Sequence, residues 1–248
     1  MEYVQNTAMK TVLILFLLAG GVWAQAPGDP LTLLRIVRRH VSPRDPVAPY
    51  RAAKPAVEVI GMRSVSGSSQ TWLMEAHGTF TSLENSDAAL SRTYTSNDAE
   101  DELIAPSVSL LCLFRDALSY RPDEALKLMP AARYVQVSIY RSRPGFDVDF
   151  AELIRMRKAA LDRVNADRPE LGYQVISGSA TGTYIFLAPL TSLKTLDQSL
   201  ARWWHTDGTP GVPRGQGRQI AAEGDITREH LMFRVDPRLS WMPEQRSQ

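Results

Sequence analysis

Residues 134–164 read YVQVSIYRSRPGFDVDFAELIRMRKAALDRV. Apolar and polar side chains alternate through residues 134–140, which predicts a β-strand with one buried face. The strand ends at the turn Arg143-Pro144-Gly145. Apolar side chains then recur at helical spacing from Phe150 to Val164, as on an amphipathic helix. This strand and helix open the structural unit that decides the fold.

The rest of the second half supplies the remaining elements of that unit. Asp149 is followed three residues later by Glu152, which is the pattern of a capping box at a helix start. Two strands around the turn Ser177-Gly178-Ser179, a helix and a last strand follow, and we expect them at residues 173–176, 183–187, 193–204 and 231–235. The order βαββαβ is that of a ferredoxin-like, split βαβ unit.

The first half of the chain repeats this order. Residues 81–92 match residues 191–202 in a Thr-Ser-Leu triplet and in single Asp, Leu and Arg positions, with a constant offset of 110 (from 81 to 191). Each half also ends on Phe-Arg followed by a Leu-Ser-aromatic segment. Solenoid repeats are about 20 to 50 residues long, so each copy here is instead a small domain. We predict an α+β protein with two ferredoxin-like units in tandem, at 29–125 and 131–243.

The first unit departs from the second in its first helix. Its strands are expected at 33–39, 63–65, 72–77 and 109–115, with a helix from about residue 83. Four prolines crowd residues 41–60, and a proline past the first helical turn costs about 3 kcal/mol, so a helix there is short or broken. Residues 94–106 are expected to add a short helix. The Gly- and Pro-rich residues 207–217 predict a mobile loop, and whether it acts as a lid stays open.

The strand, the turn at Arg143-Pro144-Gly145, the helix from Phe150 and the hairpin at Ser177-Gly178-Ser179 together resemble the dimeric α+β barrel superfamily. That group includes antibiotic-biosynthesis monooxygenase-like and NIPSNAP-like proteins. The resemblance covers most of the mature chain as two copies. It implies that two units pack sheet against sheet as a pseudo-twofold barrel within one chain, with the helices outside. Members include cofactor-independent oxygenases, haem-degrading enzymes, isomerases and proteins without known activity, so the resemblance implies fold more than function.

An export signal is predicted at the beginning of the chain. Residues 12–24 form an apolar run that closes on small residues around Ala24, and we expect a signal peptide over 1–24 with cleavage after Ala24. The run is shorter than the roughly 20 residues that a membrane-spanning helix needs. The residues before Met9 carry Glu2 and no basic side chain, so the start is either Met1 or Met9. The predicted location is periplasmic or secreted.

Composition excludes several classes of function. The chain has 28 Lys and Arg against 27 Asp and Glu, so it lacks the basic excess of a nucleic-acid-binding protein. No G-x-S-x-G, H-E-x-x-H, C-x-x-C or Walker motif occurs, and we predict neither a metal site nor a cofactor. The single cysteine, Cys112, lies in an apolar strand and is expected to be buried and unreactive.

Alternation along the strands assigns candidate side chains to the lumen of the barrel. We expect the apolar face of each strand to lie under the helices and the polar face to point inward. Glu75 and His77 are two residues apart and so share one face of the third strand, where Ile185 and Leu187 correspond in the second copy. The inward set predicted to bind a small anionic or phenolic ligand is Arg35, Arg39, Arg115, Tyr134, Gln136, His230 and Arg234.

Three functions remain open from the sequence. The first is an exported protein that binds a small organic molecule in the lumen, as a monomer or homodimer, without nucleic acid or membrane contact after signal cleavage. The second is a cofactor-independent oxygenase or isomerase in which His77 is the base, Glu75 orients it and Tyr140 assists. The third is a non-catalytic assembly module whose lumen is filled by its own side chains. A solvated Glu and His at a strand edge is the alternative to any catalytic role.

Overall fold

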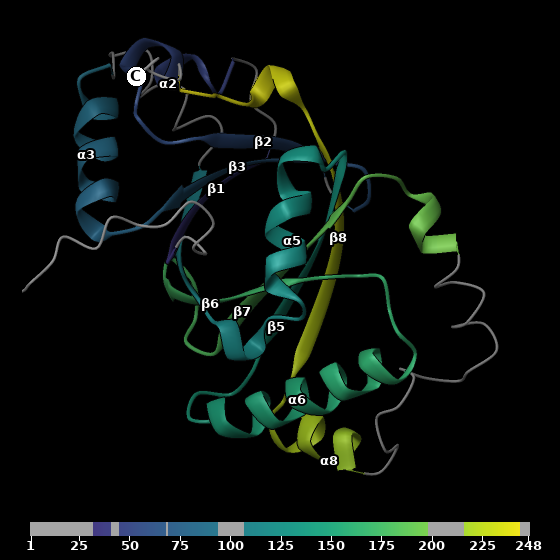
Figure 1. Ribbon diagram of the computed structural model, residues 1–248. Helices are drawn as coiled ribbons and strands as arrows, with labels where there is room; N and C mark the ends of the chain where they lie inside the picture. Colours follow the sequence, from purple (N-terminus) through teal and green to yellow (C-terminus); the bar gives the residue numbers. More distant parts are fainter. Residues whose placement is uncertain (1–31, 41–44, 68, 94–106, 198–215, 244–248) are drawn as a thin grey trace, which may run out of the picture.

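The computed structural model describes residues 32–40, 45–67, 69–93, 107–197 and 216–243. In this part of the chain, eight antiparallel strands close into a barrel in the order β1-β3-β2-β8-β5-β7-β6-β4 (Figure 1). The strands are β1 Leu33–His40, β2 Val59–Ser64, β3 Gln70–His77, β4 Ser107–Phe114, β5 Tyr134–Arg141, β6 Leu171–Ser177, β7 Thr183–Leu190 and β8 Thr227–Val235. The predicted α+β barrel class is confirmed.

Helices cover the outside of this barrel and one of its ends. The α-helices are α2 Ala48–Ala53, α3 Phe80–Ser91, α5 Pro122–Leu128, α6 Asp147–Arg163 and α8 Gln216–Glu223. The described residues also form three short 3-10 helices, η1 Asp116–Leu118, η2 Met129–Ala131 and η3 Pro237–Leu239. Residues 194–197 are also helical, and the rest of the helix predicted over 193–204 lies mostly outside the described residues.

Both halves of the barrel have the same strand order. Strands β4-β1-β3-β2 form one half and β8-β5-β7-β6 the other, and each is the order of a ferredoxin-like sheet. The two halves join where β2 pairs with β8 and where β4 pairs with β6. All eight predicted strands therefore exist, with ends that differ from the prediction by a few residues, as is usual for boundaries read from periodicity.

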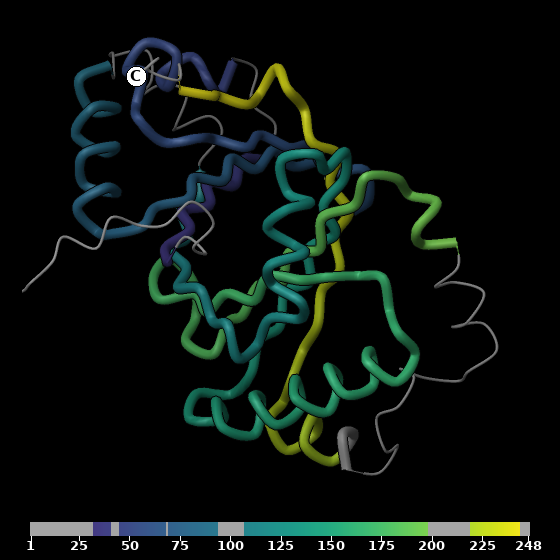
Figure 2. The backbone as a smooth tube through the Cα atoms, in the orientation of Figure 1, coloured from purple at the N-terminus to yellow at the C-terminus, as the bar shows by residue number. Residues whose placement is uncertain are grey.

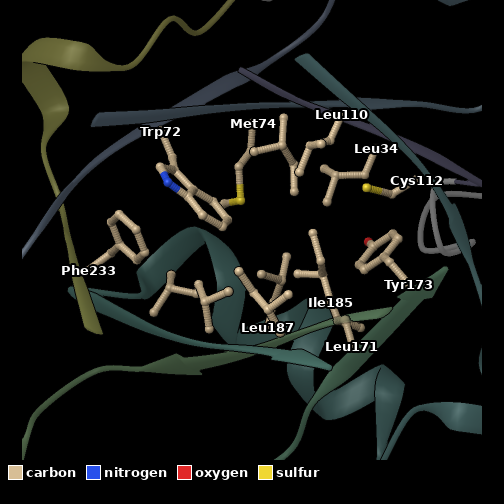
Figure 3. Packing of buried hydrophobic residues seen from close by; sticks show 14 of the residues in the cluster. Leu34, Trp72, Met74, Leu110, Cys112, Leu171, Tyr173, Ile185, Leu187 and Phe233 are labelled. Atoms are coloured by element: carbon tan, nitrogen blue, oxygen red, sulfur yellow. The ribbon is translucent and has the colours of Figure 1, made fainter. Parts of the chain in front are cut away.

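Apolar side chains from all eight strands meet in the lumen of the barrel. Trp72 and Phe233 pack with ring centroids 4.8 Å apart, and Phe114 meets Tyr173 edge to face at 5.6 Å. Figure 3 shows two layers of these side chains facing each other. The buried strand residues of the cluster are Leu34, Ile36, Met62, Trp72, Met74, Leu110, Cys112, Val135, Val137, Ile139, Leu171, Tyr173, Val175, Ile185, Leu187, Leu231 and Phe233. The lumen is filled by the chain itself.

The predicted orientation of the strands is therefore wrong. Val135, Val137 and Ile139 point into the lumen. The residues that alternate with them, Tyr134, Gln136, Ser138 and Tyr140, therefore lie on the outer face. The physical reason is that a closed lumen has neither water nor helices to satisfy polar groups, so the uniformly apolar face goes there. The outer face tolerates polar side chains because the covering helices supply partners.

Different helices cover the outer faces of the two halves. Over the first half, Val47 just before α2, Tyr50 of α2 and Leu90 of α3 pack on the strands. Over the second half, Phe150 of α6 stacks on Tyr184 of β7, with ring centroids 4.0 Å apart. Ala125 of α5 joins the lumen cluster, which places α5 over one open end of the barrel.

The observed starts of α2 and α6 agree only in part with the sequence predictions. Helix α2 has six residues, with Pro49 in its first turn and Lys54 beyond its end in a left-handed conformation, so the predicted short helix is confirmed. The predicted capping box of α6 is wrong, because the helix begins after Phe146 without a side-chain cap. Asp149 instead lies within the first turn, where its charge favours the helix dipole.

Two further helices were not predicted. Helix α5 begins with Pro122, Asp123 and Glu124, and a proline in the first turn followed by acidic residues is a usual helix start. Helix α8 begins at Gln216, so the loop predicted over 207–217 is wrong at its end. Residues 207–215 and the segment 94–106 lie outside the described residues, as does the predicted signal peptide.

The offset of 110 between the halves does not hold in the structure. The side chain of Thr79 caps α3 by accepting from Ser82 N at 3.1 Å, so Thr81 lies inside the helix. Thr191 instead precedes the helical residues 194–197. Ile185 points into the lumen whereas Glu75 does not, so the predicted correspondence of these strand positions is wrong as well.

The two segments that end the halves dock in the same way, each on the opposite half. Ser119 Oγ accepts from the backbone N of Gly172 on β6 at 2.9 Å, and Ser240 Oγ accepts from that of Gly61 on β2 at 3.0 Å. A Cβ on Gly61 would lie 1.9 Å from the carbonyl oxygen of Leu239, so only glycine permits this approach. Figure 2 shows the last described residues returning to the first half.

Cys112 lies in the lumen cluster and is free and fully buried, as predicted. Burial raises the pKa of its thiol to about 12, which removes the reactive thiolate at neutral pH. Among the described helices, none is long and apolar enough to cross a membrane.

Candidate functional site

Glu75 is the centre of a buried polar network on the outer face of the first half. We call Arg35, Tyr50, Glu75, His77 and Ser86 the Glu75 network. Glu75 and His77 come from β3, Arg35 lies opposite Glu75 on β1, and α2 and α3 supply Tyr50 and Ser86. The side chain of Glu75 is 0% exposed. Four elements of the fold thus meet at one carboxylate.

Every contact of this carboxylate is a hydrogen-bond donor. Arg35 binds it through two atoms, with Nε 2.9 Å from Oε1 and Nη2 2.7 Å from Oε2. The hydroxyl of Tyr50 donates to Oε1, and Ser86 Oγ donates to Oε2 at 3.3 Å. A bidentate arginine pair of this kind fixes orientation as well as charge.

The network keeps Glu75 ionised. Burial alone would raise the pKa of its carboxyl, but hydrogen bonds from His77, Arg35 and Tyr50 and the positive charge of Arg35 outweigh burial and lower this pKa. Arg35 also lies 3.0 Å from Asp87, an exposed carboxylate on α3. The charges of this face are therefore balanced close to one another.

His77 has a partner at each ring nitrogen. Its Nε2 lies 3.3 Å from Glu75 Oε2 and its Nδ1 lies 3.2 Å from Ser82 Oγ. The residue is 1% exposed. The sequence prediction that Glu75 and His77 lie together is confirmed, but Tyr140 lies on β5 under α6 and does not join them.

An open groove of about 520 Å³ lies beside the Glu75 network. Arg35 lines it from β1, and the other lining residues are Phe80, Leu83, Glu84 and Asp87 of α3, Ser109 and Leu111 of β4, and Ser177 of β6. The exposed ring of Phe80 forms part of one wall. The volume of the groove falls within the range of about 300–1,000 Å³ that is typical of small-molecule sites.

A second group of charges lies on the outer face of the second half. We call Arg157, Arg168, Glu170 and Arg228 the Glu170 cluster. Arg157 Nη2 is 2.6 Å from Glu170 Oε1, and Arg168 Nε is 3.6 Å from the same oxygen. Glu170 is almost fully buried. The cluster therefore holds three guanidinium groups and one carboxylate.

Predicted ligand-binding residues border the Glu170 cluster. Gln136 Oε1 accepts from Arg168 Nη2 at 2.5 Å. Ser138 Oγ lies 2.9 Å from His230 Nδ1. The guanidinium carbon of Arg228 lies 5.2 Å from the ring centroid of Tyr140, a cation–π contact.

Electrostatics in this cluster favour ionised Glu170 and neutral His230. Burial opposes the charge of Glu170, but Arg157 and Arg168 outweigh burial and lower its pKa. Desolvation and the charges of Arg228, Arg168 and Arg157 lower the pKa of His230 as well. A neutral imidazole therefore lies next to an excess of positive charge.

The other predicted ligand-binding residues lie apart from both groups. Arg115 and Arg234 are exposed near the ends of β4 and β8, and Tyr134 pairs with Arg234 across the sheet. Arg39 lies on the outer face of β1, and its Nε is buried without a hydrogen-bond partner. The carbonyl oxygen of Arg115 accepts from Ser119 Oγ at 3.0 Å, so this backbone position supports the docked segment.

Sequence reasoning missed Arg157, Arg168 and Glu170. Arg157 could have been found, because it lies on the stripe that Phe150 and Ile154 define on α6, and a charge on an apolar stripe implies a buried partner. The described residues contain no group of three His, Cys, Asp or Glu side chains suited to a metal ion.

No protein-family model matches the chain, and no curated protein matches it. Several solved structures, in contrast, are similar to it. An anthrone oxidase-like protein has a TM-score of 0.57 at 8% identity, covering 88% of this chain and 96% of that chain. A mutant chlorite dismutase from Candidatus Nitrospira defluvii has a TM-score of 0.50 at 9% identity, covering 85% and 93%.

A candidate monooxygenase from Lactobacillus acidophilus NCFM matches with a TM-score of 0.45 at 9% identity, over 82% of this chain and 94% of that chain. The TM-scores of the anthrone oxidase-like protein and the chlorite dismutase show a shared fold, and identities this low show nothing about chemistry. The chain has the fold of the dimeric α+β barrel proteins.

Proposed function

We propose that this protein is exported and binds a small organic molecule in the groove beside the Glu75 network. The observation that supports this function is the groove of about 520 Å³ between α3 and strands β1, β4 and β6. The lumen, where the sequence placed the ligand, is occupied by apolar side chains from all eight strands. The ligand site therefore moves from the inner to the outer face of the sheet.

The groove lining favours an uncharged or basic ligand with an apolar body. Phe80, Leu83 and Leu111 offer apolar contacts, and Ser109 and Ser177 offer hydroxyl groups. The charge of Arg35 is already balanced by Glu75 and Asp87. An anionic ligand would find no free cation among these residues, so the anionic class expected from the sequence fits this groove poorly.

We further propose that the barrel is a tandem duplication, with units at 29–125 and 131–243 related by a pseudo-twofold axis, and that residues 1–24 are a signal peptide. The identical strand order of the halves and the reciprocal docking of the two Leu-Ser-aromatic segments support the duplication. The apolar run over 12–24 supports export to the periplasm or beyond.

A native mass spectrum of the protein purified from its own cell envelope tests the binding function. We expect a reproducible added mass that is reduced in Phe80→Ala, which removes an exposed groove side chain at little cost in folding. Val148→Ala is the matched control, because Val148 is exposed on α6 in the other half. A bare protein mass, together with no Phe80-dependent binding of phenols, quinones or aromatic amines, would refute the groove assignment.

A second candidate function is acid–base catalysis through His77. The observation that favours it is the chain Ser82, His77, Glu75, with contacts of 3.2 and 3.3 Å. Turnover of a phenol or quinone by the wild type that disappears in His77→Gln, with folding and ligand binding retained, would establish it. Absence of any turnover leaves binding as the function. The filled lumen is also what a non-catalytic assembly module would show.

A further inference from the structure

We propose that the Glu170 cluster is a second, separate binding site, which takes the carboxylate group of a small organic acid on the outer face of the second half. The site lies on β5, β8, α6 and the segment just before β6, whereas the groove of the proposed function lies on α3, β1, β4 and Ser177 at the far end of β6. The two proposals therefore rest on different residues and can be tested independently.

The charges of this cluster do not balance. Arg157, Arg168 and Arg228 face one carboxylate, Glu170. Neighbouring acids are used elsewhere: Asp147 accepts from Tyr184, Glu229 pairs with Arg141 at 3.5 Å, and Glu152 pairs with Arg155 at 2.6 Å. Within the described residues no second carboxylate pairs with the cluster. An external anion is the group that would restore balance.

Arg228 is the arginine that a ligand can reach. It is exposed on the outer face of β8, and among the described residues it makes no ion pair with a carboxylate. Its guanidinium rests on the ring of Tyr140, which holds the group in a fixed orientation. His230 is exposed two residues further along the same face of the strand.

The buried part of the cluster has unused hydrogen-bonding capacity. Arg168 Nε is shielded from solvent and lacks a hydrogen-bond partner, so one donor of the cluster is unused. Glu170 Oε2 also lacks a partner, but it is an acceptor and offers nothing to an anion. A structural salt bridge between Arg157 and Glu170 does not require Arg168 or Arg228. Their presence beside it adds like charges in a partly desolvated place, and desolvation together with Arg157 and Arg168 lowers the pKa of Arg228.

The exposed donors match a carboxylate better than a phosphate. One guanidinium and one neutral imidazole are accessible, and a planar guanidinium binds the two coplanar oxygens of a carboxylate side by side. A phosphate dianion has three unprotonated oxygens and a higher charge, and it would require more donors than Arg228 and His230 supply.

Calorimetric titration of the mature protein with benzoate, succinate, citrate and inorganic phosphate, at constant ionic strength set with NaCl, tests this site. We expect at least one carboxylate to bind to the wild type, and Arg228→Gln to weaken that binding at least tenfold. Arg234→Gln is the matched control, since Arg234 is exposed on the same face of β8. It should leave the affinity unchanged. Chemical unfolding of Arg228→Gln confirms that the variant is folded.

Three outcomes would overturn the proposal. The first is the absence of carboxylate binding to the wild type beyond the effect of NaCl. The second is an equal loss of binding in Arg228→Gln and Arg234→Gln, which indicates a diffuse surface charge. The third is binding of phosphate without binding of any carboxylate. None of these results bears on the groove, which the Phe80→Ala variant tests by itself.

Discussion

The two halves of the barrel share a strand order and differ in the charges that they bury. In the first half, Glu75 receives donors from four elements, and Arg35 has a second carboxylate, Asp87, within 3.0 Å. In the second half, Glu170 faces three arginines. The same strand order thus accommodates a charge-balanced polar network in one half and an excess of positive charge in the other.

We expect the largest difference between the two halves when the central carboxylate of each is removed. Glu170→Gln leaves the buried Arg157 without its counter-charge, and we expect a loss of about 3–5 kcal/mol in the free energy of unfolding. Glu75→Gln should cost less, since Arg35 keeps Asp87 and the amide oxygen still accepts. Urea unfolding of both variants measures the difference. Equal losses would show that the excess of positive charge around Glu170 does not affect the free energy of unfolding.

The reciprocal docking of the two end segments gives the next effect. In Gly61→Ala the new Cβ would lie 1.9 Å from a backbone oxygen of η3, so we expect a loss of about 1–3 kcal/mol from overpacking. In Gly172→Ala the nearest atoms are 3.1 Å or more away, so the loss should be smaller. Thermal unfolding of the two variants ranks them. A larger effect at Gly172 would contradict the contact geometry.

Acid should act on both halves in the same direction. The pKa values of Glu75 and Glu170 are lowered in the folded state, so each carboxylate contributes stability that is fully present above its unfolded pKa of about 4.3. This contribution is lost as pH falls through the lower folded pKa. Unfolding measured from pH 7 to pH 3 should show that loss. Glu170→Gln should flatten the profile in part, whereas a profile identical to that of the wild type would contradict an ionised Glu170.

The smallest change in stability should come from removing one of the three neighbouring positive charges of the Glu170 cluster. Arg228→Gln removes one of three neighbouring guanidinium groups and breaks no ion pair of the described residues. We expect stability to stay equal or to rise by up to about 0.5 kcal/mol at low salt, and the difference to fall as salt is added. Urea unfolding at two salt concentrations measures it. A clear loss of stability would mean that Arg228 has a structural role.

The candidate site could be predicted only where its residues lie on one strand or on paired positions. Glu75 and His77 were placed together because two residues on a strand share a face. Tyr50 was not predicted, because no local pattern in the short α2 indicates that its side chain reaches Glu75, 25 residues further along the chain. Arg157, Arg168 and Glu170 come from a helix, a loop and a strand start, and no local pattern joins them. Contacts between such distant segments depend on packing rather than on periodicity.

Local patterns in the sequence predict the order of the strands along the chain, the short α2 and the burial of Cys112, because periodicity, proline and apolar runs act within a few residues. The face of each strand that points inward is set by tertiary packing instead. Alternation distinguishes two faces without ranking them, whereas barrel closure removes one of them from water and from every helix. The apolar face therefore fills the lumen, and polar residues such as Arg35, Glu75 and His230 lie on the outer face.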